Sequence, residues 1–443
     1  MTDLGELSLW VALLMAVWGA ALSFAGGALA REDLALSGAR GLVASSGFVA
    51  LAAAGLWWAF LTDDFAVRLV ATFSSEALRA PFKLSAAWAG RAGVVLMFAF
   101  ACAGCSVVAL RVHRAENRPL MPWLAGTCAL VLAVVLVASA AVWNPYVRLG
   151  VLPEDGRGLD PRLQDLAAAV RTPSLCLGYG AAAVALAVAL SGAVRSRCDA
   201  ACRRMLGTWT LVAWCFLSTS VLLTLRIAYT GADFSGSWIW KPAGAASLSS
   251  GFETGVAAAA GLAALLSGAT LNGGWKRVRT VARYTLVAGG ALFACGLAAT
   301  TLQTRQVVEL TDGGTIHLKD PFRREWSFTS QGASRMERPD HFATSVALRA
   351  ARGDERPQFI ATEFREYFGR DDRERFAPQT TTGIHGSLLE DVGVTLVSVG
   401  DGRASVRIAF VPFVTWVWIG GVAVVIGGAL MVWPTASKVE GIA

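Results

Sequence analysis

The residues best suited to binding chemistry lie in the segment 232–250, where Trp238 and Trp240 stand two positions apart. Long apolar runs at 207–229 and 251–272 flank this segment, so we expect a short loop where two membrane helices surface. Two interpretations of the tryptophans are open. They can anchor helix ends at the lipid headgroups, or they can form a flat aromatic shelf for a planar, apolar ligand such as a porphyrin.

Neighbouring residues complete this candidate binding loop. Gly236 lets the backbone bend closely, and Pro242 stops a helix from continuing. Phe234 adds a further ring, and Lys241 adds a cation directly after Trp240. The predicted ligand-binding loop therefore consists of Phe234, Gly236, Trp238, Trp240, Lys241 and Pro242.

The composition indicates a membrane protein, because 55% of the residues are hydrophobic and only 16% are charged. The net charge of +7 does not indicate a nucleic-acid partner, since the basic residues cluster in short loops between apolar runs. We expect a mostly α, polytopic membrane helical bundle with one small extracytoplasmic β-domain. Nine apolar runs are candidate spans: 7–30, 41–62, 91–112, 122–143, 174–195, 207–229, 251–272, 280–302 and 411–433.

The charges of the loops predict an orientation. Basic residues gather at 111–118, 195–204 and 276–283, whereas the intervening loops carry acidic and aromatic residues. Because basic loops stay in the cytoplasm, the N-terminus and the segment 232–250 are expected outside and the C-terminus inside. Acidic Asp3 and Glu6 precede the first run, so no cleavable signal is expected there.

The segment 303–410 has the pattern of a β-domain. Strand-like residues 307–310 and 315–318 flank a tight-turn sequence, and 394–399 and 405–410 flank another, which predicts two hairpins. Charged stretches at 323–324, 335–340 and 370–375 are interpreted as solvated surface. The predicted domains are a membrane domain at 1–302, the β-domain at 303–410, and a final helix with a cytoplasmic tail at 411–443.

Two further patterns have both a chemical and a structural interpretation. Cys102 and Cys105 have the spacing of a redox pair, but their position inside an apolar run without a basic neighbour favours a small-residue helix contact. His317, His341 and His385 lie in the β-domain without metal-ligand spacing, which favours surface histidines over metal or heme ligands.

Several stretches together resemble a known family, CcmF, the heme-lyase membrane subunit of bacterial cytochrome c maturation. The segment 235–242 is similar to the family's tryptophan-rich signature, W-G-x-W-W-x-W-D-P. The resemblance covers nearly the whole chain in order, although the set of spans after the tryptophan loop is shorter than in the family. The other similar stretches are 62–71, 83–88, 144–149, 155–161, 177–179, 296–310, 388–391 and 410–420.

The chain departs from the family at its histidines. The motif W-G-x-H-E-G has Arg91 at the histidine position, and H-P-P-L-L-Y-L-G-Y begins with Arg171. The other two family histidines fall near Ala259 and Val287. Axial ligation of heme iron uses His, Met, Cys or Tyr; Met205 and Tyr229 are of suitable type, but their spacing gives no support.

The resemblance implies heme on the external face, offered to the thiols of apocytochrome c. It also implies a bacterial inner membrane location and, as partners, other maturation subunits and a heme chaperone. Arg91, Arg171 and Lys241 could form a pocket for heme propionates or a membrane lipid phosphate, or each could be a snorkelling interface residue. Two alternatives to a heme lyase stay open: a non-catalytic scaffold of the maturation complex, and a binder of an anionic lipid. A second chain that supplies the missing helices and histidines is a further option.

Overall fold

The computed structural model describes residues 1–114, 117–195, 199–231, 276–338, 341–353, 355–367, 378–400 and 403–432. Within these residues, eight helices are long and apolar enough to cross a membrane. They correspond in order to eight of the predicted spans, and the predicted span 251–272 lies outside the described residues. The chain is therefore mostly helical, as the hydropathy predicted.

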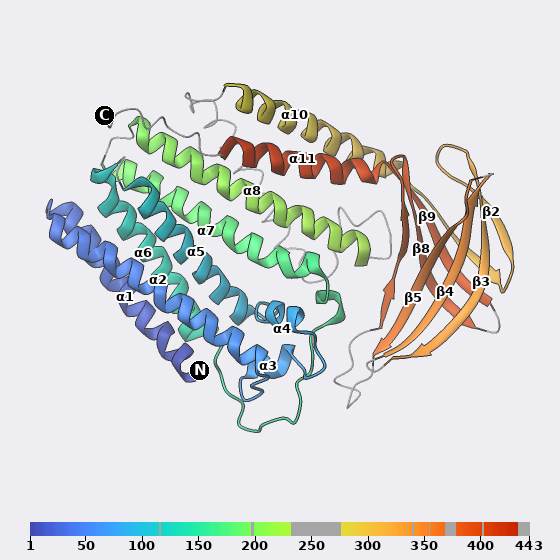
Figure 1. Ribbon diagram of the computed structural model, residues 1–443, viewed down its shortest axis with the longest axis horizontal. Coiled ribbons are helices and arrows are strands. Elements are labelled where there is room, and N and C mark those ends of the chain that lie inside the picture. The colour runs from blue at the N-terminus through green and yellow to red at the C-terminus, as the bar shows by residue number, and fades with distance from the viewer. Residues whose placement is uncertain are drawn as a thin grey trace, which may run out of the picture. The chain divides into compact units, whose positions relative to one another are not determined.

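Most helices begin or end a few residues beyond the predicted spans. For example, the predicted span 174–195 begins at Leu166, where the Asp165 carboxylate accepts a hydrogen bond from the backbone N–H of Ala167 at 3.3 Å and caps the helix. The helices are α1 (Thr2–Ala28), α2 (Glu32–Leu61), α3 (Arg68–Phe73), α4 (Ala80–Ala86), α5 (Arg91–His113), α6 (Met121–Val137), α7 (Leu166–Val194), α8 (Ala200–Gly231), α10 (Lys276–Ala299) and α11 (Val414–Val432) (Figure 1).

The described residues divide into two compact units, one built mainly by Met1–Leu223 and the other mainly by Thr280–Gly427 with the end of α8 from Thr224. In the first unit, small residues let the helices approach closely. At the contact of α1 with α2, a Cβ added to Gly41 would lie 3.0 Å from the Cα of Gly19. The predicted domain boundaries at 302/303 and 410/411 stay predictions.

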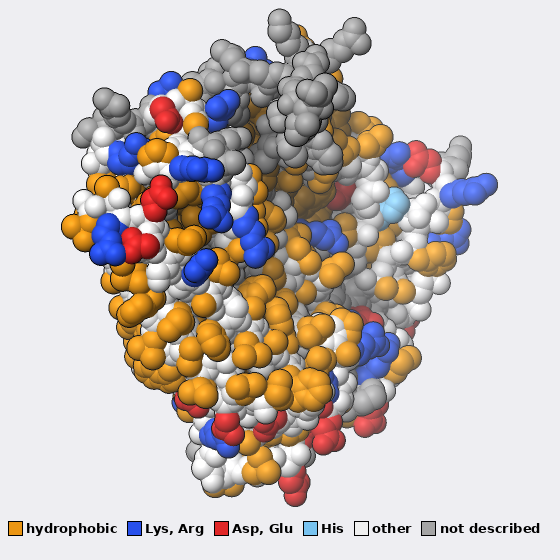
Figure 2. Space-filling model, turned by 60° about the vertical axis from the view of Figure 1, so that its left-hand side comes forward, with side chains coloured by type: hydrophobic (Ala, Val, Ile, Leu, Met, Phe, Trp, Pro, Cys, Tyr) orange, Lys and Arg blue, Asp and Glu red, His pale blue; other side chains and the backbone are white. Residues whose placement is uncertain are grey.

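The helical surface has the pattern expected of membrane spans. Figure 2 shows a wide band of hydrophobic side chains over the helices, with Lys and Arg gathered toward one end and Asp and Glu at the other. Exposed members of the hydrophobic band include Leu14, Val17, Val134 and Leu186. Such a band is the surface that lipid tails cover.

The second unit contains a β-sandwich of two antiparallel sheets, ordered β1-β9-β8-β7 and β2-β3-β4-β5-β6. Leu310, Val394 and Phe410 of the first sheet share a buried core with Trp326 and Phe328 of the second. The strands are β1 (Thr304–Thr311), β2 (Thr315–Lys319), β3 (Glu325–Glu337), β4 (His341–Arg352), β5 (Gln358–Tyr367), β6 (Gln379–Thr381), β7 (Gly383–Gly386), β8 (Glu390–Gly400) and β9 (Arg403–Pro412).

One of the two predicted hairpins is confirmed and the other is wrong. β8 and β9 pair as predicted. The strands on either side of 312–314, however, belong to different sheets, because β1 pairs with β9 and β2 pairs with β3. The turn carries the chain across the sandwich, so that Leu310 and Leu318 enter one core from opposite sheets. Gly313, at φ 75°, supplies the left-handed backbone that this turn needs.

Candidate functional site

Two connections lie at the same end of the helical unit: 62–90, which joins α2 to α5, and 143–165, which joins α6 to α7. We call this side the loop-rich end. The backbone N–H of Arg68 donates to the carbonyl of Val147 at 2.8 Å, and that of Arg157 donates to the carbonyl of Ala71 at 2.7 Å. These hydrogen bonds join the two connections into one layer.

Tyr146 fixes this layer to the helices below it. Its side chain is 2% exposed, and its hydroxyl donates to the backbone carbonyl of Ala52 in α2. Gly5 of α1 makes room for the ring, since an added Cβ would lie 2.4 Å from the Tyr146 oxygen. The Asn144 side chain donates to Glu6 at 2.8 Å, and Arg148 pairs with Asp3. The acidic residues near the N-terminus therefore bind the second connection.

An ion pair between a buried lysine and a half-buried aspartate stabilises the first connection. Lys83 in α4 is 8% exposed and pairs with Asp63, which has a left-handed backbone at φ 51°. The Ser74 hydroxyl donates to the same carboxylate at 3.4 Å. Both charged residues belong to stretches that resemble the family, but their separation in sequence gave no signal that they pair.

The two predicted site arginines lie at the loop-rich end of neighbouring helices. Arg91 is the first residue of α5 and is exposed, while Arg171 is half-buried near the start of α7. The two helices run in the same direction, since Phe98 packs on Tyr179 with ring centroids 6.3 Å apart and Gly180 lies against Ala101. The structure thus brings both cations to one level, and their convergence on one ligand stays a prediction.

The other predicted site residues lie outside the described residues: Phe234, Gly236, Trp238, Trp240, Lys241 and Pro242. Near the end of α8, Tyr229 is 3% exposed. Its hydroxyl donates to Asp391 of β8 at 2.7 Å, and its ring packs on Trp418 of α11 at 5.7 Å. The last turn of α8 is therefore attached to the β-sandwich and to α11.

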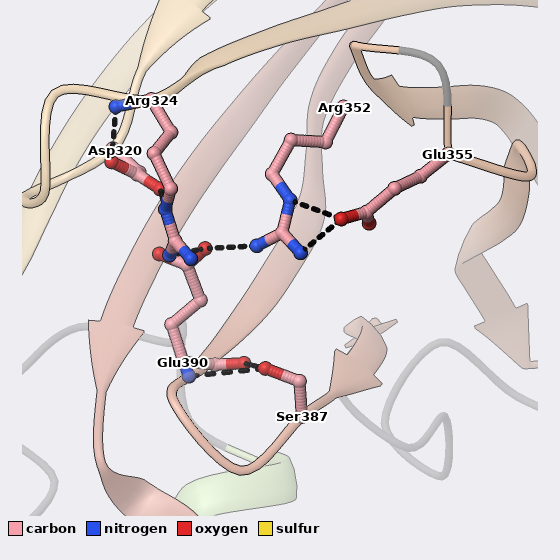
Figure 3. Close-up of polar contacts among 6 residues, drawn as sticks. All are labelled: Asp320, Arg324, Arg352, Glu355, Ser387 and Glu390. Carbon is pink, nitrogen blue, oxygen red and sulfur yellow. Dashed lines mark hydrogen bonds and ion pairs between the residues drawn. The ribbon is translucent and has the colours of Figure 1, made fainter.

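A network of charged residues surrounds Glu390, the neighbour of Asp391 at the start of β8 (Figure 3). Arg324 binds Asp320 at 2.6 Å and also pairs with Glu390, which is 1% exposed. Arg352 reaches Glu390 at 3.6 Å and Glu355 at 2.5 Å. Glu390 begins β8 of one sheet, whereas Arg352 ends β4 of the other and Arg324 lies in the loop between β2 and β3, so the network links the two sheets. The prediction that 323–324 is solvated surface holds for Arg323 and is wrong for Arg324.

Burial sets the titration of the two acids at the start of β8. Burial and the nearby Asp320 carboxylate raise the pKa of Glu390 to about 7, although both arginines oppose the shift. Burial also raises the pKa of Asp391, while the hydrogen bond from Tyr229 lowers it. One oxygen of each carboxylate is buried without a hydrogen-bond partner. Burial thus disfavours the charged form of both carboxyl groups in the folded protein.

Across the part of the chain that the structure describes, no group of three His, Cys, Asp or Glu side chains is arranged to hold a metal ion. Cys102 and Cys105 are buried in α5, and the Cys105 sulfur lies 4.0 Å from the Leu177 carbonyl of α7, which supports the helix-packing interpretation. His317 is exposed beside Glu325. Met205 is buried in the helical core at 2% exposure.

Comparison with known proteins agrees with this architecture. A solved structure described as "Cytochrome c Heme Lyase CcmF" superposes with a TM-score of 0.71 over 98% of both chains at 13% identity, which shows a common fold. No protein-family model matches the chain. The fold thus defines a class of multi-pass membrane proteins with an attached β-sandwich.

Sequence relatives agree with the structural match. The chain is 34% identical over 244 residues to the cytochrome c-type biogenesis protein CcmF of Pseudomonas aeruginosa and 33% identical over 208 residues to the probable biogenesis protein NrfE of Escherichia coli. These matches cover 54% and 47% of the chain, but only 37% and 38% of the relatives' own lengths. The chain is thus similar over about half of its length to cytochrome c-type biogenesis proteins, and it spans little more than a third of the relatives that it matches.

Proposed function

We propose that this protein takes part in cytochrome c maturation by handling heme, as cargo, at its loop-rich end. The main support for this proposal comes from the two connections, because the segments that resemble the family are also the ones that contact each other in the structure. The segments 62–71 and 144–149, which resemble the family's external loops, are the segments that hydrogen-bond into one layer. Arg91 is the first residue of α5 and Arg171 lies in the second turn of α7, the two helices that follow this layer.

The proposed location is a bacterial inner membrane with the loop-rich end outside the cytoplasm. The basic loops support this orientation, because Arg111, Arg114 and Arg118 lie at the opposite end of the helices from Arg91. A membrane-impermeant thiol reagent applied to intact cells is expected to label a cysteine placed at Met336 in the β-sandwich. It is expected to leave a cysteine placed at Arg114 unlabelled.

The residues present suit the porphyrin better than its iron. Arginine forks match carboxylates, so Arg91 and Arg171 can bind the propionates. The ring would stack on Trp238 and Trp240. Of the two side chains considered as substitute iron ligands, Tyr229 donates its hydroxyl to Asp391 and Met205 is packed in the core. We therefore propose that the chain holds heme by its faces and propionates, for transfer to apocytochrome c by a complex of maturation subunits.

A second candidate function is a scaffold that recruits the maturation subunits without holding heme. Arginine at two of the family's histidine positions favours this alternative, and the same arginines would suit an anionic lipid. Both candidates keep the chain in contact with a membrane and with protein partners.

The absorption spectrum of the purified full-length chain separates these functions. Hemin added to the protein in nanodiscs is expected to give a Soret band with a defined stoichiometry. Replacing Trp238 and Trp240 with alanine is expected to weaken binding roughly tenfold or more, since loss of ring stacking removes about 1–3 kcal/mol. The matched control replaces Trp10 and Trp18, which are exposed on α1. A wild-type chain without a specific Soret band would instead support the scaffold.

A further inference from the structure

The β-sandwich meets the start of α11 through two short loops, 320–324 and 387–389. The backbone N–H of Phe413, the residue before α11, donates to the Leu389 carbonyl at 2.8 Å. The Trp416 indole donates to the Leu388 carbonyl at 3.0 Å, and the Thr415 hydroxyl donates to the Ser387 carbonyl at 2.7 Å. The loop 387–389 is thus fixed to the first turn of a membrane-spanning helix.

The loop 320–324 lies beside the same turn. The Phe322 ring packs on Phe413 with centroids 5.7 Å apart, and Phe413 packs on Trp416 at 5.3 Å. Arg324 holds this loop in place, because it bonds to Asp320 within the loop and to Glu390, which follows the other loop. The two loops therefore form one rigid surface around the entry of α11.

This surface is apolar where a soluble domain would be polar. Leu388 is 65% exposed, Leu389 is 46% exposed and Phe322 is 43% exposed. We call these three residues the apolar rim. The rim continues the exposed stripe of α11, where Ile419 and Val422 are also about half exposed.

We propose that the apolar rim inserts into the interfacial layer of the lipid bilayer and anchors the β-sandwich to the membrane surface. Because α11 crosses the membrane and begins at Val414, the loops bonded to its first turn lie at the depth of the headgroups. Trp416 has the type and position of an interfacial anchor. Arg323, exposed between Phe322 and Arg324, can reach lipid phosphates from this position.

Quenching of a fluorophore by lipids tests the proposal. A polarity-sensitive fluorophore is attached to Leu388→Cys in the full-length chain in phosphatidylcholine nanodiscs, with Cys198, Cys215 and Cys295 replaced by serine. Lipids with a nitroxide near the headgroup are expected to quench this probe at least threefold more strongly than a probe at Met336→Cys, whereas aqueous iodide is expected to quench it less. Met336 is a suitable control because it is 56% exposed and lies roughly 35 Å from the start of β3, at about 3.3 Å per residue.

A probe at Phe322→Cys gives an independent measurement from the other loop, so a local disturbance at residue 388 cannot decide the result alone. Both probes are expected to show the lipid quenching. If neither is quenched by lipid more than the Met336 probe, and both are open to iodide, the β-sandwich stands clear of the bilayer and the proposal is wrong.

Discussion

Glu390 and Asp391 are consecutive residues of β8 whose carboxylates serve opposite faces of one sheet. Glu390 pairs with Arg352 of the other sheet and with Arg324 of the loop before β3, while Asp391 accepts a hydrogen bond from Tyr229 of α8. Successive side chains of a strand alternate between faces. One dipeptide thus joins the two sheets to each other and the sandwich to the helix that precedes the predicted tryptophan loop.

Glu390 is expected to give the β-sandwich a pH-dependent stability. Its pKa is about 7 in the folded protein and 4.5 ordinarily, so between these values the folded chain holds a proton that the unfolded chain releases. The free energy of unfolding therefore falls as pH rises through this window, by at most about 1.4 kcal/mol per pH unit. Glu390→Gln should abolish the slope, as measured by hydrogen exchange in β3 and β8 of the full-length chain.

The matched control for this experiment is Glu355→Gln. Glu355 belongs to the same network, but its side chain is 59% exposed. The Glu355→Gln substitution should therefore leave the pH dependence of the unfolding free energy unchanged. Burial raises the pKa of Asp320, but hydrogen bonds from Arg324 lower it by more. The pKa of Asp320 therefore lies below its ordinary value and below this window. A Glu390→Gln variant that keeps the wild-type slope would show that another group titrates.

Tyr229→Phe should loosen the attachment of α8 to the sandwich. The change removes the hydrogen bond to Asp391, whose other oxygen is already buried without a partner. We expect a loss of about 1–3 kcal/mol, read as faster hydrogen exchange at the start of β8. Tyr284→Phe, at a residue 72% exposed on α10, should change nothing. Equal exchange in both variants would mean that the Tyr229 bond contributes no stability.

Breaking the ion pair of Lys83 and Asp63 should destabilise the loop-rich end. Lys83→Met leaves the half-buried Asp63 carboxylate without its cation, at an expected loss of about 1–3 kcal/mol. Adding Asp63→Asn should restore much of that loss, because the pair is then neutral and asparagine tolerates the left-handed backbone. Thermal unfolding in nanodiscs measures both variants. No recovery in the double variant would contradict the ion-pair account.

Gly5→Ala should displace Tyr146 from its site between the helices. The added methyl group would lie 2.4 Å from the tyrosine oxygen, and overpacking of this kind typically removes about 1–3 kcal/mol. Gly47→Ala is the control, because nothing lies within 4 Å of a Cβ added there. If thermal unfolding gives the same midpoint for both alanine variants, the Gly5 contact is not tight.

Hydropathy was enough to predict the helical class, because membrane spans need long apolar runs that few other structures show. The β-segment was predictable from strand-like residues that flank turn sequences. Pairing between distant segments was not predictable in the same way. β1 and β9 are joined in register from Thr304 with Phe410, and nothing local to either strand specifies that partner. For the same reason, neither the pairing of Lys83 with Asp63 nor that of Arg324 with the buried Glu390 was predicted, because charged residues are expected at the surface unless a partner is known.

Hemin affinity shows whether Arg91 and Arg171 bind the propionates of heme at the loop-rich end. Replacing both with glutamine should raise the Kd at least tenfold, because each charge-assisted bond contributes about 1.5–3 kcal/mol. Arg114→Gln with Arg118→Gln, an equal loss of charge at the other end of the helices, should leave the Kd unchanged. We expect a weakened Soret titration in the first double variant alone; an unchanged titration there, or an equal loss in both, would show that these arginines do not bind the propionates.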